Sequence, residues 1–171
     1  MSLSEGQKTA LRVVPRVTAA LSFMGSAFIL IARRRSRRRV VGQSLLLSMC
    51  VLDLLSSTSY LIGDAAFPTS RHGSVATCNI QGMLCHLQVG AAIHSGFLAW
   101  YYCLFVRFNW KEERLAKFYL PAAHCIVWLF LIITGALAFQ YFDPHWIRCY
   151  ITGPGSNLYF WIFFYVVRCI C

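Results

Sequence analysis

One acidic residue lies in the middle of an apolar run. Asp53 is flanked by leucines in the segment LSMCVLDLLSS. If this run crosses a membrane, the carboxylate is costly unless it is protonated, paired or hydrated, so it should face the interior of a helix bundle. The functional interpretation of Asp53 is a polar switch or an ion site in a polar core. The alternative is a neutral aspartic acid hydrogen-bonded to a neighbouring helix.

A second group of polar side chains lies further along, on another apolar run. Gln81 and Gln88 are seven residues apart, and His86 and His94 are eight apart, so each pair projects from one side of a helix. Gln81, Gln88 and His94 are therefore candidates for lining a ligand cavity that opens to the outside. The alternative is that they pack against hydroxyl groups of the preceding apolar run.

Sequence patterns typical of enzymes and metal sites are missing. Cys85 and His86 are adjacent, so they point to different faces of a helix and do not have the spacing of zinc ligands. Nucleophile elbows, phosphate-binding loops and paired catalytic carboxylates do not occur either. We therefore predict no enzyme activity, no metal and no cofactor.

The elements that must position these residues are long apolar helices. Of the 171 residues, 58% are hydrophobic and only 13% are charged, and the mean hydropathy is +0.58. A bilayer core of about 30 Å requires about 20 apolar helical residues. The sequence predicts an all-α, multi-pass transmembrane bundle, with a polar tail over residues 1–12, spans at 13–32, 43–67, 78–106 and 119–142, and the start of a fifth at 157–171.

The formal net charge of +10 is compatible with nucleic-acid binding, but the placement of the charge favours a membrane surface. Six of the thirteen arginines lie between the first two apolar runs, where such charge sets orientation and attracts anionic lipid headgroups. We expect the lipid bilayer, and no nucleic acid, as the partner of this arginine loop. Its six arginines are Arg33, Arg34, Arg35, Arg37, Arg38 and Arg39.

The distribution of Lys and Arg also predicts the orientation of the chain. Ten of these residues lie on the side of the arginine loop, and five lie on the opposite side. The positive-inside rule therefore places the arginine loop in the cytoplasm and the N-terminus outside, and we expect the plasma membrane. Arg107, at the inner end of the third span, is an interfacial anchor or a contact for a cytoplasmic partner.

Two cysteines are brought to the same side by this topology. Cys78 opens the third span, and Cys149 lies in the loop after the fourth span. Two membrane crossings return the chain to the outer side, where an oxidising compartment permits a disulfide between them. Two free thiols are the alternative.

These features together resemble the first half of a seven-helix G-protein-coupled receptor. The resemblance rests on Cys78 at the head of the third span, the string LDLLSS, the arginine loop and Cys149 in the second outer loop. The strings CNIQGMLCHLQVG and IRCYITGPG are most similar to the cyclic AMP receptor-like group, which is related to the secretin-type receptors. The resemblance implies an outer cavity for an extracellular ligand of unknown identity, and inner loops that contact a heterotrimeric G protein.

The chain ends early in the predicted fifth span. We therefore expect an N-terminal part of a receptor, which would not couple to a G protein without the sixth and seventh helices. The alternative function is a small carrier or channel subunit, in which Asp53 and the histidines of the third span line an ion route. A third possibility is a membrane-embedded assembly subunit.

Overall fold

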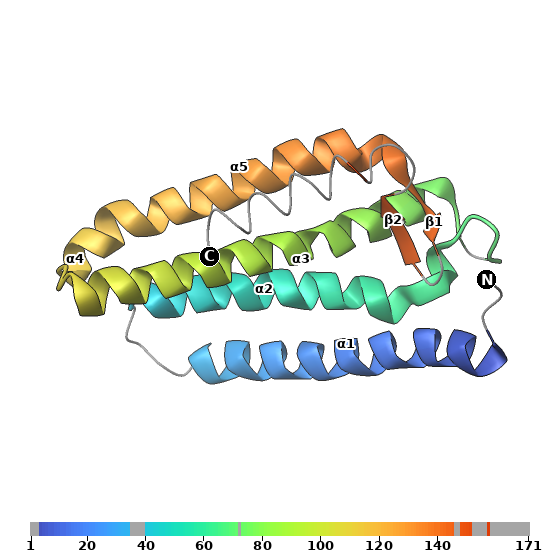
Figure 1. Ribbon diagram of the computed structural model, residues 1–171, viewed down its shortest axis with the longest axis horizontal. Helices are drawn as coiled ribbons and strands as arrows, with labels where there is room; N and C mark the ends of the chain where they lie inside the picture. Colours follow the sequence, from blue (N-terminus) through green and yellow to red (C-terminus); the bar gives the residue numbers. More distant parts are fainter. Residues whose placement is uncertain (1–3, 35–39, 72, 146–147, 152–156, 158–171) are drawn as a thin grey trace.

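The computed structural model describes residues 4–34, 40–71, 73–145, 148–151 and 157. Within them, four helices are long and apolar enough to cross a membrane, and they lie side by side in Figure 1. The prediction of an all-α, multi-pass helical bundle is therefore confirmed. The four helices are α1 (Glu5–Arg34), α2 (Val41–Ile62), α3 (Val75–Tyr102) and α5 (Leu120–Ala138).

Short helical segments extend three of these helices. A 3-10 turn, η1 (Gly63–Ala66), follows α2, and a π-helical turn, η2 (Cys103–Arg107), continues α3. The short helix α4 (Glu112–Arg114) and the π turn η3 (Leu115–Tyr119) lead into α5. The segments suited to crossing a membrane are therefore Arg12–Arg33, Val41–Ala66, Val75–Arg107 and Glu112–Ala138.

The first helix begins inside the segment that the sequence predicts as a polar tail. Ser4 and Gln7 explain this early start, because each side chain accepts a hydrogen bond from the other residue's backbone N–H, at 3.3 Å and 3.0 Å. This reciprocal arrangement is a capping box, which satisfies free N–H groups at a helix N-terminus. The tail is thus helical from Glu5 onward.

The fourth span begins and ends earlier than predicted. It is helical from Glu112, because Glu112 and Glu113 lie in its first turn, where negative charge complements the helix dipole. The Glu112 carboxylate also accepts a hydrogen bond from the Val41 N–H at the start of α2. Helix α5 ends at Ala138, and the 3-10 turn η4 (Phe139–Tyr141) follows it.

The loop after the fourth span contains a β-hairpin, where the sequence indicates only turns. Strand β1 (Phe142–His145) pairs antiparallel with β2 (Arg148–Ile151), and Pro144 lies opposite Cys149. The hairpin lies at the end of the bundle near the N-terminus (Figure 1), which we call the disulfide end. Of the predicted fifth span, 157–171, all residues after Asn157 lie outside the described residues.

Among the described residues, the core is arranged in three groups along the bundle. Helix α3 contacts both α2 and α5, and α1 contacts α2. A Cβ atom on Gly90 of α3 would lie 2.6 Å from a methyl carbon of Leu131, so glycine permits the close approach of α3 and α5. From the α4 end to the disulfide end, the buried groups are Val41, Leu45, Tyr101, Leu104, Leu115 and Ala123; then Leu52, Ile93, Val127 and Leu131; then Ala138, Phe142 and Ile151.

One face of α1 exposes large apolar side chains at helical spacing. Phe28 is 72% exposed and Leu21 is 60% exposed, although both lie in a segment suited to crossing a membrane. In water such an exposed apolar face would favour aggregation, whereas in a bilayer it matches the surrounding lipid. The exposed residues of this face are Val13, Val14, Val17, Leu21, Met24, Phe28 and Ile31.

Candidate functional site

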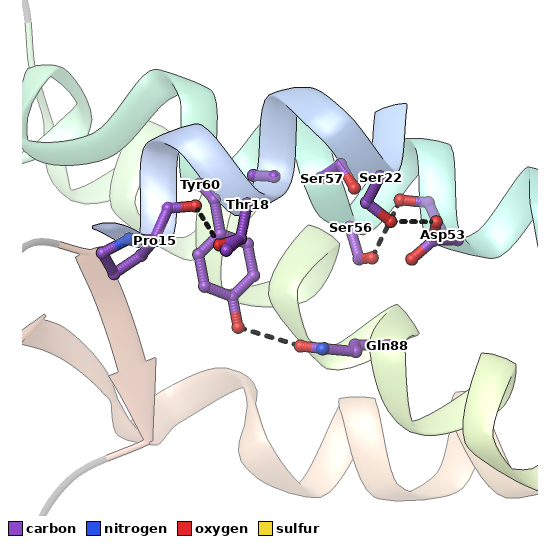
Figure 2. A pocket seen from close by; sticks show the side chains of 9 residues that line it. Pro15, Thr18, Ser22, Asp53, Ser56, Ser57, Tyr60 and Gln88 are labelled. Atoms are coloured by element: carbon purple, nitrogen blue, oxygen red, sulfur yellow. Dashed lines mark hydrogen bonds between the residues drawn. The ribbon is translucent and has the colours of Figure 1, made fainter. Parts of the chain in front are cut away.

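A polar cavity of about 280 Å³ lies between α1, α2 and α3. Figure 2 shows the polar side chains that line it. Helices α1 and α2 supply most of the lining, and Gln88 is the contribution of α3. The lining residues are Pro15, Thr18, Ala19, Ser22, Asp53, Ser56, Ser57, Tyr60 and Gln88.

Asp53 faces α1 and forms part of the cavity wall. Its Oδ2 atom accepts hydrogen bonds from the hydroxyl groups of Ser22, at 2.5 Å, and Ser26, at 2.7 Å. The two serines are four residues apart on α1, so both reach the same carboxylate oxygen. The sequence analysis identified Asp53 but missed its partners, although the four-residue spacing of two serines in an apolar span was a usable signal.

Gln88 lines the cavity, whereas the other two ligand-pocket candidates lie elsewhere. The Gln88 Oε1 atom accepts a hydrogen bond from the Tyr60 hydroxyl at 2.9 Å (Figure 2). Gln81 is only 1% exposed, and its amide group serves three backbone groups instead. Its Nε2 donates to the carbonyl groups of Ser59, at 2.8 Å, and Gly63, at 2.7 Å, while its Oε1 accepts from the Cys149 N–H at 2.9 Å.

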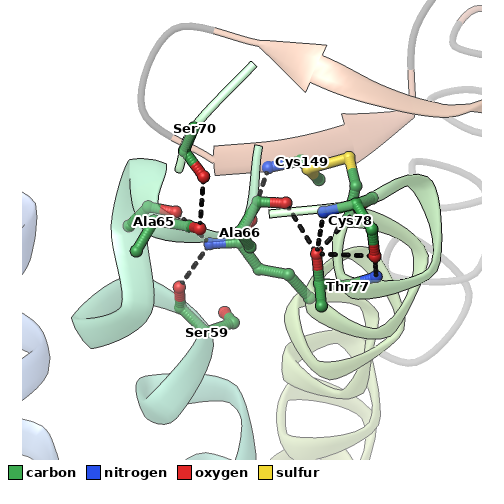
Figure 3. The surroundings of a disulfide bond; sticks show 10 residues. Ser59, Ala65, Ala66, Ser70, Thr77, Cys78 and Cys149 are labelled. Atoms are coloured by element: carbon green, nitrogen blue, oxygen red, sulfur yellow. Dashed lines mark hydrogen bonds between the residues drawn. A yellow bond between two sulfur atoms is a disulfide. The ribbon is translucent and has the colours of Figure 1, made fainter. Parts of the chain in front are cut away.

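The hairpin is tied to the head of α3 by the disulfide between Cys78 and Cys149. Figure 3 shows this bond next to Thr77, whose hydroxyl donates to the carbonyl oxygen of Ala66 at 3.0 Å. The sequence predicted this pairing from topology alone. The bond closes a stretch of chain with a sequence separation of 71, so it joins β2 to a distant helix.

The histidines of α3 face α5 and not the cavity. His94 is fully buried, and its Nε2 lies 3.2 Å from the Nδ1 of His124 on α5. His86 Nε2 lies 3.0 Å from the Thr134 hydroxyl oxygen, also on α5. The structure therefore does not bring His86 or His94 together with Asp53, whose side-chain partners are on α1.

An ion pair between α1 and η1 lies close to the cavity. The guanidinium group of Arg16 donates to the Asp64 carboxylate at 2.6 Å, and both side chains are about half exposed. Gly63 has a φ of +57°, and a Cβ atom there would clash with the guanidinium group of Arg16, so glycine leaves room for the arginine side chain. No local sequence pattern predicts this ion pair, because 48 residues separate its members.

The cationic candidates lie at the end of the bundle opposite the disulfide. Arg107 is exposed and closes η2, while Arg33 and Arg34 end α1. The other arginines of the predicted loop, Arg35, Arg37, Arg38 and Arg39, lie outside the described residues. Among the described residues, no group of three His, Cys, Asp or Glu side chains is placed to hold a metal ion.

Comparison of the chain with known proteins gives no match. No protein-family model matches the chain, and no curated protein matches it at a significant level.

Proposed function

We propose that this chain is the N-terminal part of a seven-helix receptor of the G-protein-coupled type, and that it receives its ligand at the disulfide end. In this proposal the disulfide end faces outward, the arginine loop faces the cytoplasm, and the protein resides in the plasma membrane. A heterotrimeric G protein is the proposed partner of the full-length receptor at the arginine end.

The observation that carries this proposal is the attachment of the hairpin to the head of α3. The disulfide from Cys78 to Cys149 makes one connection, and the hydrogen bond from the Cys149 N–H to Gln81 makes a second. Phe142 of β1 also lies directly over Gly82 of α3. A loop held in this way is a preorganised surface at the disulfide end, as a receptor needs for reproducible ligand recognition.

The contacts of Asp53, His86 and His94 argue against an ion route through these three residues. A route through Asp53, His86 and His94 requires that these side chains follow one path. Asp53 instead bonds to serines of α1, and the two histidines contact Thr134 and His124 of α5. The carrier or channel alternative therefore lacks a specific observation in its favour.

The proposal is tested by sequencing the native transcript across codon 171 and then measuring coupling of its product. An in-frame continuation into further apolar runs, each of about 20 residues, is expected. Energy transfer between the complete product and a tagged G-protein α subunit should then be detectable, and Arg107→Ala should weaken it more than the outer-side control Arg71→Ala. A native stop after Cys171 in a complete transcript would contradict the proposal.

A further inference from the structure

The hydroxyl groups that α1 contributes to the cavity already donate hydrogen bonds to other groups of the protein. Thr18 Oγ1 donates back to its own helix, where the carbonyl oxygens of Val14 and Pro15 both lie at 3.0 Å. Ser22 Oγ donates to Asp53 Oδ2. A hydroxyl group has one proton and two lone pairs, so both oxygens face the cavity only as acceptors.

The same is true of two hydroxyl groups on α2. Ser56 Oγ donates to the backbone carbonyl of Asp53 at 3.0 Å, and the Tyr60 hydroxyl donates to Gln88 (Figure 2). Four lining hydroxyls therefore offer lone pairs and no proton. The side-chain donors that remain in the lining are the Gln88 amide nitrogen and the Ser57 hydroxyl. The cavity consequently has more acceptors than donors, which suits an occupant rich in N–H groups.

The charge of the lining also favours an occupant rich in N–H groups. Among the nine lining residues, Asp53 is the only acid, and none is Lys, Arg or His. The arginine nearest in sequence, Arg16, is paired with Asp64 outside the lining. A carboxylate within a span is costly without a positive partner, so a cationic occupant would supply the charge that the lining lacks.

We propose that this cavity binds a small organic ammonium ion, with its N–H groups directed to Asp53 and to the hydroxyl oxygens around it. Because one water takes about 30 Å³ of liquid volume, the cavity has room for about nine non-hydrogen atoms. It is far too large for a bare metal ion and lies below the range of about 300–1,000 Å³ typical of drug-sized ligands. The proposal rests on the proposed receptor function, because it names the class of that receptor's ligand.

The test measures binding of phenethylammonium chloride to the full chain in lipid nanodiscs. The readout is the unfolding midpoint followed by tryptophan fluorescence, with sodium chloride at equal ionic strength and phenethyl alcohol as the charge and neutral controls. The ammonium salt should raise the midpoint saturably, and neither control should. Asp53→Asn keeps an oxygen acceptor but removes the charge, so it should weaken apparent affinity by about tenfold or more.

Two further variants keep the test decisive. Glu113→Gln removes an exposed carboxylate at the opposite end of the bundle and should leave binding within about twofold of the native affinity, since each tenfold corresponds to about 1.4 kcal/mol. Ser57→Val keeps Asp53 and places methyl groups in the cavity, so it should weaken binding even if Asp53→Asn does not fold. The proposal is overturned by an equal shift with sodium chloride, by no saturable shift, or by unchanged affinity in folded Asp53→Asn or Ser57→Val. Because occupancy is read without a G protein, failure to bind is distinct from failure of the receptor proposal.

Discussion

Gln81 connects three separate parts of the chain through one amide group. It joins the ends of α2 and η1 to the hairpin, since it bonds to Ser59, Gly63 and Cys149. The Ser59 carbonyl also accepts from the Gly63 N–H, but buried polar groups that lose a partner are expensive in a low-dielectric interior. The side chain thus acts as a clamp at the disulfide end.

Gln81→Leu should lower the stability of the bundle strongly. The substitution removes all three hydrogen bonds, and each buried group left without a partner costs about 1–3 kcal/mol. The measurement is the free energy of unfolding of the purified chain in detergent. Gln88→Leu is the matched control, because the same substitution on the same helix removes one hydrogen bond at an exposed position. Equal losses in the two variants would refute the clamp.

Spacing along a helix could predict part of this site but not all of it. Seven residues separate Gln81 from Gln88, which correctly gives them similar directions around α3. The neighbours at each height differ, however: η1 and the hairpin surround Gln81, while Gln88 reaches Tyr60 and the cavity. Periodicity determines an angle around one helix, and it contains no information about which other segments pack at that level.

At the scale of elements, the hairpin is the feature that sequence patterns missed. Its strands have four residues each, and proline and glycine near them are typical of turns. Isolated two-stranded hairpins are marginal in water, so this one depends on contacts with α3. Those contacts are the disulfide, the Gln81 clamp and the packing of Phe142 on Gly82, none of which a local pattern reveals.

Gly82→Val should displace the hairpin from α3. A Cβ atom at this position would lie 2.5 Å from the ring of Phe142, so the ring or the helix must move. Overpacking of this kind costs about 1–3 kcal/mol. Faster hydrogen exchange at the β1 and β2 amides, together with a lower unfolding midpoint, would report the displacement.

Gly25→Val is the control for this experiment. Gly25 also lies within a long helix, but a Cβ atom there would meet nothing within 4 Å. The change in helix propensity is the same in both variants, so the difference between them isolates the contact with Phe142. If Gly82→Val exchanges no faster than Gly25→Val, the hairpin does not depend on this packing.

At the scale of the whole molecule, the fold class could be predicted because the signal is repeated and one-dimensional. Each long apolar run independently meets the length that a bilayer requires. The ends of the runs were harder to place, because the Ser4–Gln7 capping box and the Glu112 turn extend helices into polar sequence. Orientation is a different kind of property, since it depends on the charge at the two ends of the bundle and not on packing.

The proposed orientation should depend on the arginine loop as a set. Ten Lys and Arg residues lie on its side and five on the other, so removing the six loop arginines leaves four against five. Replacing all six with glutamine should therefore give a mixed or inverted orientation. The measurement is antibody access, on intact and permeabilised cells, to a tag placed after Ser2. In the native sequence the tag should be reached on intact cells.

A matched variant separates this effect from a general loss of charge. Replacing the other four basic residues on the same side with glutamine leaves six against five, so the native orientation should be retained. These four residues are Arg107, Lys111, Arg114 and Lys117. A tag after Ser2 that is protected in intact cells expressing the native sequence would exclude an external N-terminus. It would also place the Cys78–Cys149 end in the reducing cytoplasm, where such a bond is rare.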